Sequence, residues 1–175
     1  MPDGTWYLGI DPGLRGALAL LPPDGECVAC SDTPIVHVKR GTSTRAQYAP
    51  GDMRAALVSL LAKATVANGA DSPQPAYVVA VIELVHALPG EGVRSVGTLM
   101  RGSGLWEGMC TGLGLSVRIV APIAWKKHAG LLRTKKGAAR VVASTMFPTL
   151  DLGPKSGTGR ADAVLIAAYG RSQQF

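Results

Sequence analysis

The sequence is poor in cysteine, in long apolar runs and, over its second half, in acidic residues. Three cysteines, an odd number, do not make a disulfide framework and favour a reducing compartment. No apolar run approaches the roughly 20 residues that cross a bilayer, so we expect a soluble protein. The first residues include no basic segment ahead of an apolar block, so neither a signal peptide nor a transit peptide is visible.

Cys27 and Cys30 form a Cys-x-x-Cys pair. No second pair accompanies them, and a strand would point the two side chains to opposite faces. We therefore do not expect a zinc site.

Charge is spread unevenly along the 175 residues. From Gly92 onward the sequence has twelve basic and three acidic residues, a net charge of +9, whereas the first half has a net charge of −3. This asymmetry is typical of a surface that binds a polyanion, although a solubilising surface gives the same composition. The candidate DNA-binding residues are Arg94, Arg101, Lys126, Lys127, Lys136, Arg140 and Arg160.

The chain is organised around residues 6–11, an apolar run that predicts a buried strand ending on Asp11. Residues 77–83 repeat this arrangement, because a β-branched run typical of a central parallel strand ends on Glu83. Ligands of open α/β sheets gather at the carboxyl ends of strands, so Asp11 and Glu83 would meet if the two strands are neighbours. An aspartate before Pro-Gly also caps turns, and only further acids decide between the two explanations.

The remaining pattern predicts an α/β domain over residues 1–175. Strands at 6–11, 16–21 and 25–33 form an antiparallel meander, and 77–82 and 116–120 are further strands. Helices are expected over 50–68, from 105 to 113, from 121, over 138–147 and over 160–169. Residues 36–48 are expected to be a loop, and 86–104 a Gly-rich basic loop that either approaches a phosphate or is mobile.

The last helix supplies a third acid. Asp162, Leu165, Ile166 and Tyr169 share one helix face, which places Asp162 on the buried side, although an acid in the first turn also complements the helix dipole. Three inward acids repel one another without a cation, and such oxygen ligands suit Mg²⁺ or Mn²⁺. Two such ions activate a water and stabilise the leaving oxygen in phosphodiester cleavage. The sequence therefore predicts a metal-dependent nuclease.

Three motifs resemble the RuvC-type Holliday junction resolvases of the ribonuclease H superfamily: Gly-Ile-Asp-Pro-Gly at 9–13, Ile-Glu at 82–83 and Arg-Ala-Asp-Ala-Val-Leu-Ile-Ala-Ala at 160–168. The plant and algal plastid resolvases look more similar still. Their shared runs fall at 9–21, 32–34, 104–106, 125–128, 134–135, 147–148 and 159–170.

This resemblance implies a ribonuclease H-like fold, with a mixed sheet of three antiparallel and then two parallel strands and with helices on both faces. It implies a homodimer that cuts two strands of a four-way DNA junction symmetrically. Asp11, Glu83 and Asp162 would be catalytic acids that hold two Mg²⁺ or Mn²⁺ ions. Lys135 would assist catalysis or only contact a phosphate, and residues 86–101 would probe the crossover and read bases.

The resemblance also implies a chloroplast nucleoid location, or the cytoplasm for a bacterial or phage protein. Two positions depart from the family pattern. Bacterial relatives carry a histidine or aspartate where this chain has Gly159, and plastid relatives carry glutamate where it has Asp162. Both departures leave three acids for the metal site.

Three other functions remain to be distinguished. An actin-like or sugar-kinase ATPase needs a duplicated domain and a second phosphate loop, for which 175 residues are too few. A ribonuclease H-like enzyme acting on RNA would cut hybrids in preference to junctions. A non-catalytic junction-binding module would not depend on the acids.

Overall fold

A computed structural model describes residues 4–26, 29–67, 77–87, 90–135, 137–154 and 157–175. Its five-stranded sheet has the order β3-β2-β1-β6-β7. The strands are β1 (Trp6–Asp11), β2 (Ala17–Leu21), β3 (Ala29–Asp32), β6 (Val78–Glu83) and β7 (Ser116–Val120). Strands β1, β2 and β3 pair antiparallel, whereas β6 pairs parallel with both β1 and β7. The predicted meander, the central parallel strand and the mixed sheet are confirmed.

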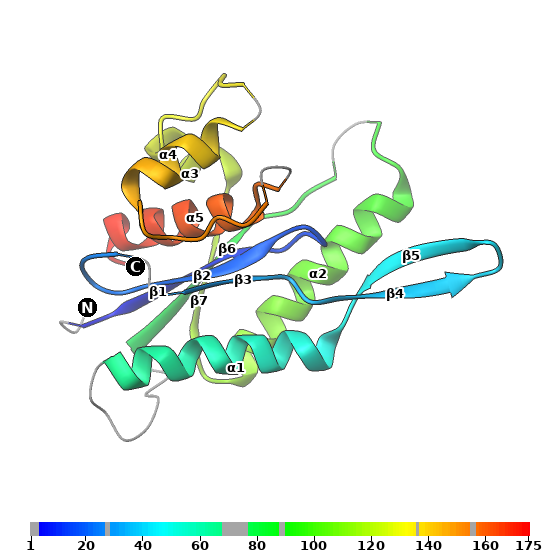
Figure 1. The fold of residues 1–175 in the computed structure, drawn as a ribbon, viewed down its shortest axis with the longest axis horizontal. Helices are drawn as coiled ribbons and strands as arrows, with labels where there is room; N and C mark the ends of the chain where they lie inside the picture. Colours follow the sequence, from blue (N-terminus) through cyan, green and yellow to red (C-terminus); the bar gives the residue numbers. More distant parts are fainter. Residues whose placement is uncertain (1–3, 27–28, 68–76, 88–89, 136, 155–156) are drawn as a thin grey trace.

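Helices cover both faces of the sheet, as expected (Figure 1). One face packs against α3 (Pro122–His128), α4 (Ala138–Met146) and α5 (Gly159–Gln173), and the other against α1 (Pro50–Ala67) and α2 (Val93–Gly112). Successive strand residues point to opposite faces, so Tyr7 joins the α5 side while Leu8 and Ile10 join the α1 side. The central strands are apolar throughout because both of their faces are buried.

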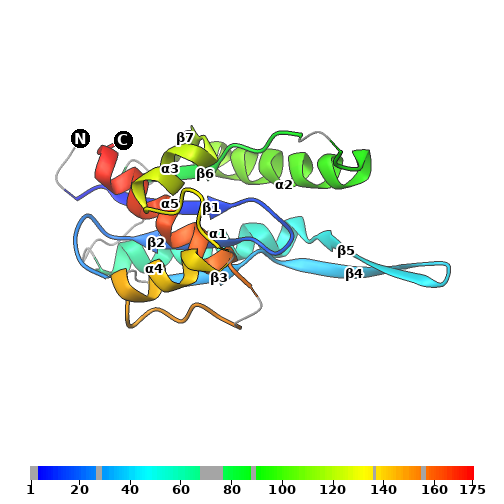
Figure 2. The ribbon, with the colours of Figure 1, turned by 90° about the horizontal axis from the view of Figure 1, so that it is seen from above.

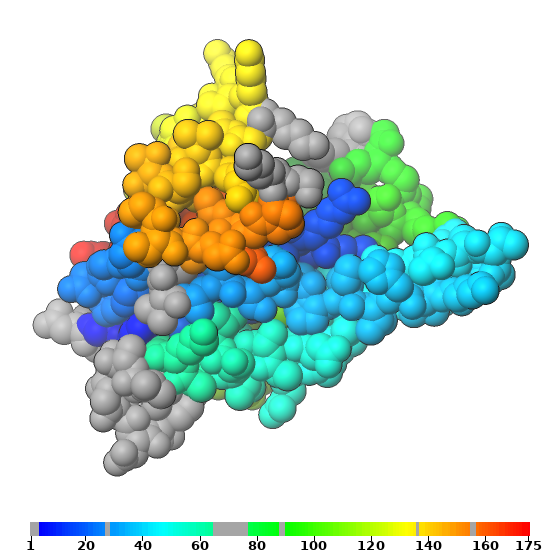
Figure 3. Space-filling view, in the orientation of Figure 1, coloured from blue at the N-terminus to red at the C-terminus, as the bar shows by residue number. Residues whose placement is uncertain are grey.

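Residues 36–48, expected to be a loop, belong to a β-hairpin. Strands β4 (Ile35–Arg40) and β5 (Ser43–Tyr48) pair antiparallel around a two-residue turn in which Gly41 has φ +62°, a left-handed conformation that such turns favour. The hairpin projects from the sheet in Figure 1, Figure 2 and Figure 3. Most of its residues are exposed, so no apolar alternation marks it in the sequence.

The Gly-rich loop expected over 86–104 is also wrong for most of its length, because α2 begins at Val93. Glycines in this stretch lower its helix propensity by about 1 kcal/mol each, but tertiary packing overrides that preference. Gly102 shows the packing most clearly, because a Cβ there would overlap the Tyr48 ring and lie 2.5 Å from the Pro12 carbonyl oxygen. The Tyr48 hydroxyl donates a hydrogen bond of 3.0 Å to that same oxygen. The hairpin base, α2 and the turn after Asp11 are thus packed together.

The other helices follow the expected boundaries closely. Apolar spacing in the sequence predicts a buried stripe on α1, and its residues are buried: Met53, Leu57, Leu60, Leu61 and Ala64. The same spacing predicts one α4 face of Ala138, Val141, Val142 and Thr145. Of these, Ala138 and Val142 pack on the core, whereas Val141 is 65% exposed and Thr145 is also exposed. Helix α5 is buried around most of its circumference and not along one stripe. Within the described ranges, no helix combines the length and apolarity needed to cross a membrane.

Candidate active site

The three predicted acids come to one edge of the sheet. Strands β1 and β6 are parallel neighbours with Ile10 opposite Ile82, so Asp11 and Glu83, the next residues, leave the ladder side by side. Helix α5 packs directly on β1, and its first turn carries Asp162. The two strands are neighbours, which is the condition that the sequence left open.

The three carboxylates lie close enough to influence one another electrostatically. The pKa of Asp11 is raised to about 7, mainly by burial and also by the charges of Glu83 and Asp162, although a hydrogen bond from the Gly13 amide and the charge of Lys126 lower it. The pKa of Asp162 is raised to about 6, mainly by burial and also by the charge of Glu83, although a hydrogen bond with Thr158 and the charge of Lys126 lower it. A cation at this position would remove the repulsion.

Glu83 has the most specific contacts of the three acids. Its Oε1 accepts a hydrogen bond of 3.0 Å from the indole Nε1 of Trp125 and lies 3.9 Å from the Nζ of Lys126. Both partners lie on α3, which follows β7, the strand beside β6. The Lys126 ammonium lowers the pKa values of Asp11 and Asp162 as well, so it is a cation shared by the whole acidic group.

The donor chemistry of this group fits a hard divalent cation, because it offers carboxylate oxygens that repel one another. Across the described part of the chain, however, no three His, Cys, Asp or Glu side chains are gathered closely enough to form a metal site as they stand. The contacts of Glu83 with Trp125 and Lys126 account for its position. Rotation of the Asp11 and Asp162 side chains toward Glu83, which keeps its contact with Trp125, would be needed to bring the three acids around a common point.

Lys135 lies beside this group. A cavity of about 320 Å³ is lined by Lys126, Thr134, Lys135, Thr158 and Asp162, together with apolar residues of α3 and α4. Lys135 is exposed, so its ammonium is free to meet a ligand in the cavity. Its catalytic role stays a prediction.

Gly159 explains why this chain has three acids and not four. It is buried, and a Cβ there would overlap the carbonyl oxygen of Arg15 in the turn between β1 and β2. A histidine or aspartate at this position would therefore force α5 away from that turn. The structure uses position 159 for close packing.

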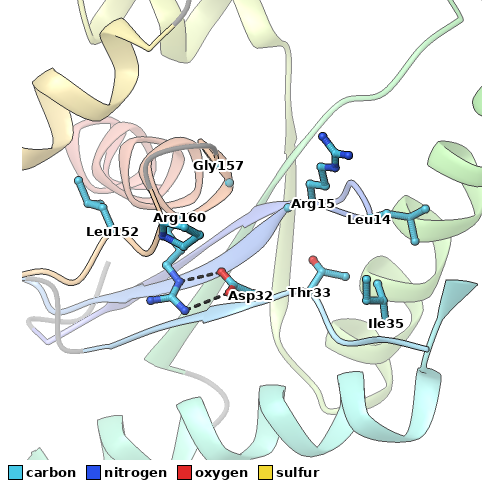
Figure 4. Close-up of a pocket in the computed structure, with 11 residues that line it drawn as sticks. Leu14, Arg15, Asp32, Thr33, Ile35, Leu152, Gly157 and Arg160 are labelled. Carbon is cyan, nitrogen blue, oxygen red and sulfur yellow. Dashed lines mark hydrogen bonds and ion pairs between the residues drawn. The ribbon is translucent and has the colours of Figure 1, made fainter. Parts of the chain in front are cut away.

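Arg160 and Arg140 are engaged within the protein. The Arg160 guanidinium donates to both carboxylate oxygens of Asp32 at 2.7 and 3.0 Å, as Figure 4 shows. It also donates to Asp151 at 2.8 Å, and we name these three residues the α5 clamp. Arg140 donates to the carbonyl oxygens of residues 152–154. Contacts of these two arginines with DNA stay a prediction, one that their internal partners do not favour.

The other candidate DNA-binding residues are placed on two helices. Arg94 and Arg101 are exposed on α2, and Lys127 is exposed on α3 beside Lys126. Arg94 also lines a groove of about 410 Å³ with Tyr48 and Thr98. Lys136 lies outside the described residues, as does Cys27.

Sequence reasoning missed Trp125, and it assigned Lys126 to DNA and not to the acids. The run at 125–128 is one of the stretches shared with plastid resolvases, and that was the signal that could have identified both. The reasoning also missed the basic hairpin, whose exposed residues include His37, Lys39, Arg40 and Arg45.

No family model matches the sequence. A Holliday junction resolvase MOC1, chloroplastic, of Chlamydomonas reinhardtii is 36% identical over 119 residues, which are 66% of this chain and 13% of the relative. This chain thus spans about an eighth of that relative's length.

Among solved structures, RuvC of T. thermophilus, in complex with a Holliday junction substrate, superposes with a TM-score of 0.56 over 97% of this chain and 96% of its own, at 14% identity. At that identity the likeness establishes the fold, which is the ribonuclease H-like fold expected from the sequence. The resemblance of this chain to the RuvC-type Holliday junction resolvases is therefore confirmed in both sequence and fold.

Proposed function

We propose that residues 1–175 form one nuclease domain that resolves four-way DNA junctions by paired, symmetric phosphodiester cleavage. The observation that carries the proposal is the convergence of Asp11, Glu83 and Asp162 at the carboxyl edge of β1 and β6, beside Lys126 and Lys135. The similar curated protein is named a Holliday junction resolvase, and the solved structure of similar fold is in complex with a Holliday junction substrate.

Asp11, Glu83 and Asp162 would hold two divalent ions, Mg²⁺ or Mn²⁺. When bound, such ions supply an activated water and stabilise the leaving oxygen. The chain's own residues prepare this site: the sheet ladder fixes the spacing of Asp11 and Glu83, and α5 brings Asp162 to them. Lys126 and Lys135 would face the scissile phosphate, for which a lysine acts as a point charge.

Symmetric cleavage of two strands needs two sites, which a homodimer provides. We place the dimer contact on the exposed side of α2, where Val93 is 90% and Met100 is 50% exposed. Gly97, Gly104 and Gly108 lie on the same side, and a Cβ at any of them would meet open space. Exposed glycines in a helix each cost about 0.5 to 1 kcal/mol, and close approach of a second helix offsets that cost. Gly104→Leu should lower the dimer fraction in analytical ultracentrifugation.

Positive charge around the site supports DNA as the ligand. The β4–β5 hairpin places Lys39, Arg40 and Arg45 on an arm that projects beyond the sheet, as Figure 3 shows. Its base contacts the turn after Asp11 through Tyr48. A DNA arm bound at the acids would therefore extend along the hairpin and make phosphate contacts there. Because the similar curated protein is named as chloroplastic, we also propose that this protein acts in the chloroplast, at its nucleoid.

One experiment tests the proposed reaction. The protein is incubated with labelled four-way junctions, linear duplexes and RNA–DNA hybrids in the presence of Mg²⁺ or Mn²⁺, and the nicks are mapped. We expect paired incisions in the junction alone. The cleavage rate should fall more than about 100-fold on Glu83→Gln, because losing a direct metal ligand should reduce activity more than losing a group that only supports a ligand. Asp24→Asn, an exposed turn acid, should cut normally.

Two results would replace this proposal. Preferred cleavage of the hybrid would indicate an RNA-directed enzyme of the same fold. Junction binding without any cleavage, unchanged by Asp11→Asn, would indicate a binding module.

A further inference from the structure

Trp125 is the one tryptophan whose indole N–H finds a protein acceptor within the described residues. Its Nε1 donates to the Oε1 of Glu83 at 3.0 Å. Trp6 and Trp106 are equally buried, at 2% and 0% exposure, but their Nε1 atoms have no partner among those residues. Leaving a buried N–H without an acceptor costs free energy, yet two of the three indoles have none among the described residues. A hydrogen bond to a carboxylate therefore distinguishes Trp125 from the other two tryptophans.

The indole ring of Trp125 is held rigidly. It is 1% exposed and belongs to the apolar cluster that α3, α4 and α5 form on one face of the sheet. Lys126, in contrast, has a side chain that is 43% exposed and reaches the same Oε1 atom only at 3.9 Å. Its ammonium also lies 5.1 Å from the centre of the Trp125 ring. Of the two partners of Oε1, the tryptophan is the one that can fix a direction.

Glu83 needs such a partner more than Asp11 does. A glutamate has three side-chain torsions, whereas an aspartate has two, and the Asp11 Oδ1 atom is already anchored at 3.2 Å by the amide of Gly13. The hydrogen bond from Trp125 occupies Oε1 and leaves Oε2 available as a ligand atom. Carboxylates that bind metals are held by outer hydrogen bonds of this kind, and removing one typically weakens metal binding or activity by about 10- to 100-fold.

We infer that Trp125 is a positioning residue for the cleavage site, whose indole N–H holds the Glu83 carboxylate in the orientation that presents its second oxygen to the metal. This inference rests on the proposed function. Trp125 itself contacts neither DNA nor metal, and it acts through Glu83. The pairing joins α3 to the end of β6, so it also fixes Lys126 next to the three acids.

The first test measures Mn²⁺ binding in the absence of DNA, by electron paramagnetic resonance of free Mn²⁺. Trp125→Phe keeps an aromatic ring in the cluster and removes only the N–H donor and part of the ring. We expect Mn²⁺ binding to weaken by about 10- to 100-fold. The Mg²⁺ concentration that half-saturates junction cleavage should rise by the same factor, while cleavage at saturating Mg²⁺ falls less. Trp6→Phe, the same truncation at a tryptophan with no acceptor, should leave both measurements unchanged.

The second test observes the Trp125 N–H directly, in a Glu83 variant that keeps the tryptophan. Three tryptophans give three indole N–H resonances in a ¹⁵N correlation spectrum, and Trp125→Phe identifies the one that belongs to Trp125. On Glu83→Gln that resonance should shift because its acceptor loses its charge, whereas the resonances of Trp6 and Trp106 should stay in place. If Trp125→Phe does not fold, selective labelling with Trp6→Phe and Trp106→Phe makes the assignment.

The outcomes separate the two proposals. Wild-type Mn²⁺ affinity in a folded Trp125→Phe protein, or an unmoved Trp125 resonance in Glu83→Gln, would overturn the positioning role. Failure of the wild-type protein to cut junctions, together with weakened Mn²⁺ binding in Trp125→Phe, would overturn the proposed reaction and support the positioning of Glu83 at a metal site.

Discussion

Asp11→Asn should make the metal-free protein more stable at pH 8, although it removes one of the three acids proposed to act in catalysis. The pKa of Asp11 is raised from 3.8 to about 7, first by burial and then by Glu83 and Asp162. In the unfolded chain this carboxyl titrates near its ordinary value. Between about pH 4 and about pH 7, the folded protein therefore holds a proton that the unfolded chain has released, so raising the pH favours unfolding.

The size of the effect follows from the shift. A pKa shift of one unit is worth about 1.4 kcal/mol, so the rise of Asp11 from 3.8 to about 7 amounts to about 4 kcal/mol of lost stability once the pH exceeds both values. Asparagine carries no charge and can still accept the hydrogen bond from the Gly13 amide. We expect most of this loss to be absent from the variant.

Urea unfolding in EDTA at pH 5, 6, 7 and 8, followed by circular dichroism, measures the difference. Wild type should lose stability as the pH rises, and the slope should be shallower in Asp11→Asn. Adding Mg²⁺ at about 100 times its dissociation constant should restore about 2.7 kcal/mol to wild type, and much less to the variant. Asp24→Asn makes the same change of charge on an exposed turn and should follow wild type. The reasoning fails if Asp11→Asn is the less stable protein at pH 8 in EDTA, or if Asp24→Asn gains equally.

Two further predictions test the packing around the site, and a third tests DNA binding by the hairpin. Gly9→Ala would place a Cβ 2.5 Å from a backbone nitrogen of α5, so it should lower the free energy of unfolding by about 3 kcal/mol and reduce cleavage. Gly51→Ala, at an exposed position of α1 where a Cβ meets nothing, should raise the free energy of unfolding by about 0.5 kcal/mol, as thermal unfolding would measure. Asp32→Asn weakens the α5 clamp and should cost about 1 kcal/mol, an effect that 1 M salt reduces. Arg40→Ala and Arg45→Ala should each weaken junction binding and lower the salt slope of log K by about 1, as fluorescence anisotropy would measure. An unchanged slope would remove the hairpin from the DNA contact.

The sequence was sufficient for the parts of the site that depend on strand ends. Strands β1 and β6 are apolar because both faces are covered, and each ends on a carboxylate that cannot be buried alone. Those two features predict the sheet edge where Asp11 and Glu83 meet. Asp162 followed from helical spacing in the same way, although α5 is buried more completely than a single apolar stripe suggests.

Other parts were hidden because tertiary packing decides them. The glycines of 86–104 have low helix propensity, so the local sequence does not predict α2. Only the folded structure explains one of them, because Gly102 packs closely against Tyr48 and Pro12. The hairpin buries too little for its strands to alternate. A large aromatic residue such as Trp125 is expected in the core. Nothing in the adjacent sequence indicates that its N–H donates a hydrogen bond to a glutamate 42 residues away.

The parallel pairing of β1 with β6 has a consequence for how such enzymes diversify. Adjacent strands lie about 4.8 Å apart whatever connects them, so the distance between Asp11 and Glu83 does not depend on the length of the intervening chain. A change in the length of the exposed β4–β5 hairpin, which lies in that stretch, therefore leaves this spacing unchanged. On the proposed function, exchanging the hairpin for another would alter the DNA contacts without moving the two acids.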